Sequence, residues 1–194
     1  MNQSISLFSL FSSILHLFLV LNFYGGVTVN GDIVSNLCEN VTRVYPTQNY
    51  EFCVSALEAN PLSKTSDIFG LGVISLELCS NNATYIRTYI DGILKDGKPE
   101  PERARTCLQN CIGFYSTALE DVQAAIEAFK GKDYVTAYRQ LVTGALIDAD
   151  TCKRGFQDVG VDFSPLKKQN YDFSQLIGIS LGIITEIRGT TNLQ

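Results

Sequence analysis

Histidine is almost absent from this 194-residue chain, because the only one, His16, lies in the apolar N-terminal segment. Histidine is the usual acid–base group near neutral pH and a frequent zinc ligand. Its absence elsewhere excludes Ser–His and Cys–His nucleophilic catalysis and histidine-containing metal sites from the rest of the chain. The chain also lacks a glycine-rich phosphate-binding loop before a helix. We therefore expect no cofactor and no bound metal.

Paired carboxylates remain as candidates for catalysis, and their spacing argues against it. Glycoside hydrolysis needs two carboxylates that face each other across a cleft. Glu120 and Asp121 are sequence neighbours that a helix would place on its polar surface. Asp148 and Asp150 would point about 200° apart on a helix. The sequence therefore predicts a protein that is not an enzyme.

Charged side chains are missing from residues 1–31, and residues 7–24 are almost entirely apolar. Small residues follow at Gly25–Gly26, a pattern typical of a secretory signal peptide. A membrane anchor would need about 20 unbroken apolar residues and then a basic flank. The first charge here is acidic, Asp32. We predict a signal peptide at residues 1–31 and one secreted, extracellular domain at residues 32–194.

Basic side chains are too scattered to form a binding surface for an acidic polymer. The formal net charge is −5, and no Lys/Arg stripe with interleaved aromatic residues is present. We expect neither nucleic acid nor membrane as a partner of the mature chain. Asn40 and Asn82 each begin an Asn-x-Thr sequon, which predicts glycosylation in a secreted protein.

Strand patterns are also missing, since no segment alternates apolar and polar residues for long. Helical spacing recurs instead, and its clearest example is a 3-4-3-4 seam of Leu108, Cys111, Tyr115, Ala118, Val122, Ala125 and Phe129. Similar patterns predict three further long helices, at residues 68–95, 134–156 and 173–187. Short connections near residues 97 and 131 require antiparallel neighbours. The chain is predicted to be all-α, with an up-and-down four-helix bundle at residues 67–188 after a helical hairpin at residues 33–58.

Four of the six cysteines are placed symmetrically about predicted helix-to-helix turns. Cys38 and Cys53 flank the turn at Pro46, and Cys111 and Cys152 lie 20 and 21 residues from Gly131. Equal helical arms bring both sulfurs of a pair to the same height along the hairpin. This matters because a disulfide requires its two Cα atoms to lie within about 7 Å of each other. Secretion favours such bonds. We predict the disulfides Cys38–Cys53 and Cys111–Cys152.

Cys79 and Cys107 do not share this symmetry. They lie about ten residues out of register across the turn near residue 98, which is roughly 15 Å along a helix. A straight hairpin could not join them, whereas a kink near Asn82 or a shifted turn would allow a third disulfide. The alternative is that both are small core residues or free thiols.

An ordered set of short motifs resembles the plant invertase/pectin methylesterase inhibitor family over essentially the whole mature chain. The motifs are Cys38, Tyr45-Pro46, Cys53, Asn110-Cys111, Tyr115, Ala118, Asp133-Tyr134, Thr151-Cys152 and Ser164-Pro165. Similarity to the pollen-allergen branch, described as invertase inhibitors, is carried by Asp67, the run from Gly70 to Ser75, and Val122, Gln123, Ala125, Ile126, Phe129, Lys130 and Lys132.

The resemblance implies a disulfide-stapled bundle secreted to the cell wall (apoplast), with the same two disulfides. It also implies a non-covalent 1:1 complex in which a bundle face blocks the active-site cleft of pectin methylesterase or of cell-wall or vacuolar (acid) invertase. Thr151 is then a candidate contact with pectin methylesterase, although it could instead pack behind the disulfide. The loop at residues 164–170 is the candidate contact with invertase, through Ser164, Pro165, Lys167 and Lys168.

One departure from the family leaves the target open. Invertase inhibitors can present a Pro-Lys-Phe tripeptide, and this chain has none; it has Pro165-Leu166-Lys167-Lys168, followed by Tyr171. A carrier of a lipid or hormone is the alternative function. That function would require an interior pocket of about 300 Å³ or more, which the regular seam of small and large residues does not favour.

Overall fold

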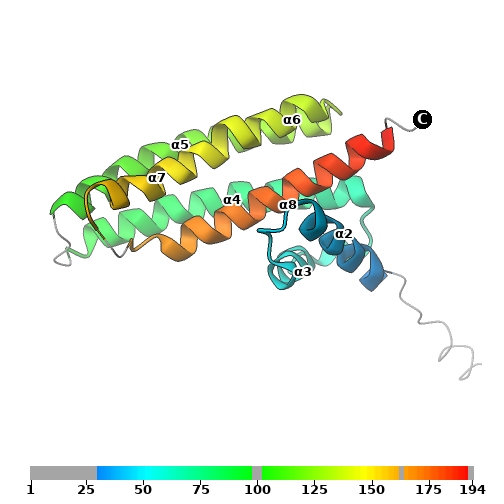
Figure 1. The fold of residues 1–194 in the computed structure, drawn as a ribbon, viewed down its shortest axis with the longest axis horizontal. Coiled ribbons are helices and arrows are strands. Elements are labelled where there is room, and N and C mark those ends of the chain that lie inside the picture. Colours follow the sequence, from blue (N-terminus) through cyan, green and yellow to red (C-terminus); the bar gives the residue numbers. More distant parts are fainter. Residues whose placement is uncertain (1–29, 98–101, 162–163, 192–194) are drawn as a thin grey trace, which may run out of the picture.

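The computed structural model describes residues 30–97, 102–161 and 164–191, and the regular elements within them are helical. The predicted signal peptide, residues 1–31, lies almost wholly outside the described residues. Four long helical segments form the body of the molecule, and a hairpin of two short helices packs beside it (Figure 1). The predicted all-α bundle with an N-terminal hairpin is confirmed.

The elements follow in chain order: α2 (Asn30–Val44), α3 (Tyr50–Glu58), the 3₁₀ turn η1 (Pro61–Lys64), α4 (Ile68–Lys95), α5 (Glu102–Lys130), α6 (Tyr134–Gln140), the π-helical turn η2 (Leu141–Ala145), α7 (Leu146–Asp158) and α8 (Lys167–Thr191). In Figure 1, α5 lies alongside α6 and α7, α4 lies alongside α8, and the hairpin α2–α3 packs on α8. The third long segment of the bundle is thus composite: α6, η2 and α7 in succession.

Side-chain caps fix where several helices begin. The Oδ1 atom of Asp67 accepts a hydrogen bond from the backbone N–H of Gly70 at 2.8 Å, which caps α4. Asn49 caps α3 in the same way through the N–H of Phe52 at 2.8 Å, and Asp133 caps α6. Each cap satisfies one of the N–H groups that the first turn of a helix leaves without a partner.

Both predicted disulfides are present. Cys38–Cys53 joins α2 to α3 with its Cα atoms 5.8 Å apart, and Cys111–Cys152 joins α5 to α7 with its Cα atoms 5.0 Å apart. The first closes a separation of 15 residues and the second one of 41. In both hairpins, helical arms of equal length therefore bring the paired cysteines together.

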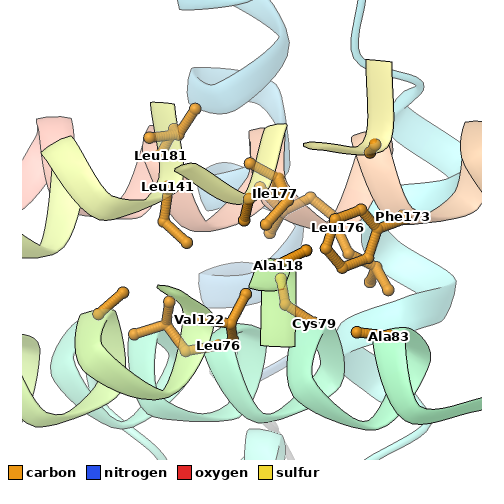
Figure 2. Packing of buried hydrophobic residues seen from close by; sticks show 14 of the residues in the cluster. Leu76, Cys79, Ala83, Ala118, Val122, Leu141, Phe173, Leu176, Ile177 and Leu181 are labelled. Carbon is orange, nitrogen blue, oxygen red and sulfur yellow. The ribbon is translucent and has the colours of Figure 1, made fainter. Parts of the chain in front are cut away.

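The interior of the bundle is filled by apolar side chains. Every residue of the predicted seam on α5 is at most 1% exposed. Figure 2 shows side chains from α4, α5, η2 and α8 meeting in one interior, among them Leu76, Val122, Leu141 and Ile177. Since these elements come from distant parts of the sequence, burial of this one core holds the bundle together.

The middle of α8, residues 175–184, is buried on all sides because neighbouring helices cover it from two directions. One side contacts α4 and α7, and another contacts α2 and α3. Glycines let the hairpin approach closely: a Cβ atom at Gly182 would come within 3.0 Å of Cγ1 of Val41, and one at Gly178 would overlap the side chain of Gln48. The prediction of a buried core helix at residues 173–187 is confirmed.

Three predicted element boundaries were wrong. The helix predicted at residues 134–156 is interrupted by the π-helical turn η2, which widens the helix by one residue per turn. The last helix begins at Lys167 and not at residue 173, so most of the predicted 164–170 loop is helical. Helix α2 begins at Asn30, three residues before the predicted start of the hairpin.

Cys79 and Cys107 are free thiols, so the possible third disulfide is absent. The Sγ atom of Cys79 lies 3.5 Å from Oγ of Ser180 on α8. The thiol of Cys107 donates instead to the carbonyl of Gly155 on α7 at 3.3 Å. The two sulfurs face different neighbouring helices, and α4 has no break near Asn82 that would bring them together.

Candidate functional site

The predicted contact residues fall on two separate surfaces of the bundle. Thr151 lies on α7, next to the Cys111–Cys152 disulfide. The others lie around the start of α8: Ser164 and Pro165 in the connection from α7, and Lys167 and Lys168 in the first helical turn. Thr151 lines a different hollow from these four residues.

The Thr151 surface is a hollow of about 490 Å³ between α5 and α7. Its lining includes both cysteines of the disulfide, the free Cys107, and the charged residues Arg154 and Asp158. Thr151 is half-buried, and its hydroxyl donates to the carbonyl of Ile147 at 2.8 Å. The hydroxyl already donates within its own helix. Thr151 would therefore contact a partner through the shape of its side chain and not as a hydrogen-bond donor.

The start of α8 is built around two residues of the α7–α8 connection. The hydroxyl of Ser164 accepts from the backbone N–H of Leu166 at 3.2 Å, and the carbonyl of Ser164 accepts from the N–H of Lys167 at 3.2 Å. Leu166 is fully buried and anchors the turn in the core. Because of this local bonding, α8 begins six residues before the start that the hydrophobic pattern indicates. The pattern misses the first turn because Lys167 and Lys168 are exposed and polar.

Lysines and tyrosines meet on the exposed surface of this first turn. Lys167 and Tyr171 lie four residues apart, hence on one face of α8, and both line a hollow of about 500 Å³ that Tyr89 of α4 borders. Tyr171 is 48% exposed. Lys168 forms an ion pair with Asp172. No aromatic residue follows Pro-Leu-Lys directly in the sequence, but Tyr171 provides an aromatic ring one helical turn after Lys167.

A pair of carboxylates that the sequence spacing did not reveal lies between α5 and α7. Burial, and then the charge of Glu120, raise the pKa of Asp121. Burial, and then the charge of Asp121, raise the pKa of Asp148. Asp150 forms an ion pair with Arg154 at 2.9 Å instead. In the sequence, Asp121 stands next to Glu120 and Asp148 stands near Asp150, so only the packing of α5 on α7 could identify the pair Asp121–Asp148.

Both predicted glycosylation sites lie within helices and are half-buried. The side-chain amide of Asn40 on α2 donates to Glu186 on α8 at 3.4 Å. Asn82 lies in the middle of α4, and its Oδ1 atom is buried. A glycan at Asn40 would have to replace its hydrogen bond to Glu186, and one at Asn82 would have to fit beside a half-buried side chain. Glycosylation of both stays a prediction.

Within residues 30–97, 102–161 and 164–191, no cluster of three or more histidine, cysteine or acidic side chains could hold a metal ion. The same residues include no helix that is both long and apolar enough to cross a membrane.

Comparison with known proteins identifies a family. Residues 32–183 match the family described as Plant invertase/pectin methylesterase inhibitor. A protein from Platanus acerifolia named "Putative invertase inhibitor" is 42% identical over 155 residues, which is 80% of this chain and 85% of the relative. "Cell wall / vacuolar inhibitor of fructosidase 2" from Arabidopsis thaliana is 27% identical over 91% of this chain and 98% of its own. "Pectinesterase inhibitor" from Actinidia deliciosa is 25% identical over 68% of this chain and 66% of its own.

Solved structures show the same fold. The crystal structure of mutant form A of a pectin methylesterase inhibitor from Arabidopsis superimposes with a TM-score of 0.63. The match covers 78% of this chain and 95% of that one, at 23% sequence identity.

Proposed function

Because the chain belongs to the plant invertase/pectin methylesterase inhibitor family, we propose that it is a secreted inhibitor that blocks the active-site cleft of a cell-wall carbohydrate-active enzyme in a non-covalent 1:1 complex. The family and the named relatives are inhibitors of enzymes, and this chain is accordingly an inhibitor and not an enzyme. Two disulfides are in keeping with an extracellular location.

Acid invertase is the first candidate target. A relative named "Putative invertase inhibitor" shares 42% identity with this chain, whereas relatives named for pectinesterase share 25–29%. The single structural observation that carries the proposal is the exposed cluster of Lys167, Lys168 and Tyr171 on the first turn of α8. It combines the positive charge of Lys167 with the aromatic ring of Tyr171, while Lys168 is paired with Asp172. Such a surface is complementary to a cleft lined by acidic side chains.

Pectin methylesterase is the second candidate, and Thr151 supports it. The hollow at Thr151 adjoins the disulfide that ties α5 to α7, so the surface around it is held rigid. Rigid surfaces lose little conformational entropy on binding. The filled interior of the bundle also supports an inhibitor over a carrier that encloses a lipid or hormone.

Titration of the purified chain into each enzyme separately tests the proposal. We expect the activity of one enzyme to fall in proportion to added inhibitor, with an end point at equimolar concentration. The double variant Lys167→Glu, Lys168→Glu should weaken inhibition of invertase, and Thr151→Arg should weaken inhibition of pectin methylesterase. Lys64→Glu, at an exposed lysine of η1, is the matched control and should inhibit like the parent.

Two outcomes would contradict the proposal at different levels. If neither enzyme loses activity in a several-fold molar excess of inhibitor, in mildly acidic and in neutral buffer, inhibition of these enzymes is wrong. If an enzyme is inhibited but every variant matches the parent, the assigned contact surfaces are wrong while inhibition stands.

A further inference from the structure

A hollow of about 420 Å³ lies between the end of α7 and the start of α8. Its described lining is Lys153, Phe156, Gln157, Val161, Ser164, Lys167, Asn170, Tyr171 and Ser174. A second hollow, of about 330 Å³, shares Lys153, Asn170 and Ser174 with it and reaches back to Val142 in the π-helical turn. The two form one groove along α7 and α8, with a size typical of small-molecule sites.

The charge of the first hollow is opposite to that of the protein. Lys153 from α7 and Lys167 from α8 line it, and none of its described lining residues is acidic. The whole chain has a formal net charge of −5. Asp150 lines the second hollow, but its carboxylate is paired with Arg154 at 2.9 Å. This end of the groove therefore favours an anion.

Asn170 provides an independent indication of a ligand. It is 5% exposed, and its Oδ1 atom accepts a hydrogen bond from the hydroxyl of Tyr115 at 2.6 Å. Its Nδ2 atom is buried and has no hydrogen-bond partner among the described residues. A buried amide donor without a partner is costly, and Asn170 lines both hollows. An acceptor atom of a ligand in the groove would remove that cost.

The remaining lining is largely apolar and aromatic. Tyr171 is 48% exposed and offers its ring to the hollow, whereas Phe156 is fully buried and lies behind the accessible wall. Val161 completes this part of the lining. A flat apolar ring would bury its surface against these side chains while a charged end stays near the lysines.

We propose that this groove binds a small carboxylic acid that carries a flat apolar ring. Lys153 and Lys167 hold the carboxylate, Asn170 donates to one of its oxygens through Nδ2, and the ring packs on Val161 and Tyr171. The inference does not depend on the proposed function, because it concerns the free protein and is tested without a target enzyme.

Phenylacetate and its neutral counterpart phenylacetamide are suitable probes, because they share ring and size and differ in charge. Titration of the ¹⁵N-labelled full mature chain, followed by amide chemical shifts, gives affinity and location together. We expect phenylacetate to bind at least about tenfold more tightly than phenylacetamide and more tightly than acetate, which lacks the ring. The shifted amides should centre on Val161, Tyr171 and Ser174.

Variants separate the two recognition elements. Lys153→Gln and Lys167→Gln should each weaken phenylacetate binding about threefold to fivefold, as expected for exposed charges. Asn170→Asp keeps an acceptor for Tyr115 and replaces the amide donor with an anionic oxygen, so it should weaken binding at least about tenfold. Lys64→Gln is the control and should bind like the parent. Unchanged amide spectra outside the groove would show that each variant is folded.

Three results would overturn the proposal. The first is a dissociation constant for phenylacetate weaker than about 10 mM. The second is equal affinity for phenylacetate and phenylacetamide, which would show an apolar hollow without anion recognition. The third is a set of shifted amides that lies away from α7 and α8.

Discussion

The carboxyl group of Asp121 on α5 lies directly against Gly144 in the π-helical turn η2, in space that the Cβ atom of any other residue would occupy. Glycine at this position lets α5 and the third bundle segment approach closely. Asp148 lies one helical turn after Gly144. The same close approach brings Asp121 near enough for its charge to raise the pKa of Asp148. One glycine thus permits both the helix contact and the carboxylate pair.

Substitution of Gly144 by alanine should destabilise the protein. The added methyl group would overlap the carboxyl group of Asp121, and overpacking of this kind costs about 1–3 kcal/mol. Gly113→Ala, on an open part of α5 where a Cβ atom meets nothing within 4 Å, is the matched control. It should raise the free energy of unfolding by up to about 1 kcal/mol, because alanine favours a helix over glycine. Urea denaturation of both variants checks this, and equal effects would show that the Asp121–Gly144 contact is unimportant.

The Asp121–Asp148 pair should make stability depend on pH. Both pKa values are raised above the ordinary value of 3.8 by burial and by neighbouring negative charge. The folded state therefore binds protons more tightly than the unfolded chain, and stability falls as the pH rises from about 3.8 through the raised pKa values. Above that range Asp121→Asn should be more stable than the parent by about 0.5 kcal/mol, the size of a like-charge repulsion on helices.

Unfolding followed as a function of pH checks this prediction. The difference between Asp121→Asn and the parent should shrink as the pH falls below the raised pKa values. Asp91→Asn, at an exposed residue of α4, should not reproduce the effect. A stability difference for Asp121→Asn that is independent of pH would contradict the assignment.

Much of the fold could be predicted from the sequence because it depends on regular spacing. The seam from Leu108 to Phe129 follows the helical period, and every residue in it is buried. Equal arm lengths placed Cys111 opposite Cys152, and the structure joins them. Spacing also separated Cys79 from Cys107, although it left a third disulfide open until the helix faces were known.

The remaining features depend on local backbone geometry or on contacts between helices, neither of which leaves a periodic signal. The π-helical turn adds one residue without changing the composition of its segment. Lys132, and not the neighbouring Gly131, takes the left-handed conformation after α5, with φ of 63°. The start of α8 at Lys167 depends on Ser164 and on the buried Leu166.

The same distinction holds for the candidate site. Lys167 and Lys168 could be predicted as candidate contacts, but Pro165 and the lack of regularly spaced apolar residues indicated a loop around them. The alignment of Lys167 with Tyr171 on one helix face could therefore not be predicted. The amide of Asn170 was missed too, since its burial and its bond to Tyr115 arise only when α5 and α8 pack together.

Removal of the two disulfides should have different consequences. By loop-closure entropy, Cys38→Ala with Cys53→Ala should cost about 3 kcal/mol, and Cys111→Ala with Cys152→Ala about 4 kcal/mol. The hairpin α2–α3 packs mainly on α8, so loss of its staple should act locally. We expect faster amide hydrogen exchange confined to α2 and α3 in the first double variant and a lower global urea midpoint in the second. Unchanged exchange in the hairpin would show that packing alone holds it.

The two free thiols should differ in reactivity because they differ in access to solvent. Cys79 is fully buried, and burial raises its pKa to about 12. Cys107 is 7% exposed and lines the hollow at Thr151, and burial followed by the charge of Asp158 raises its pKa. Since the thiolate is the reactive form, both should be alkylated slowly by iodoacetamide at about pH 8, Cys107 before Cys79.

Modification of Cys79 should require opening of the bundle and should therefore accelerate with urea in step with unfolding, whereas modification of Cys107 should begin in the native state. Peptide mass spectrometry of timed samples distinguishes the two sites. Equal rates, or a Cys79–Cys107 bond in the unreduced protein, would show that these side chains do not face α8 and α7 as the structure places them.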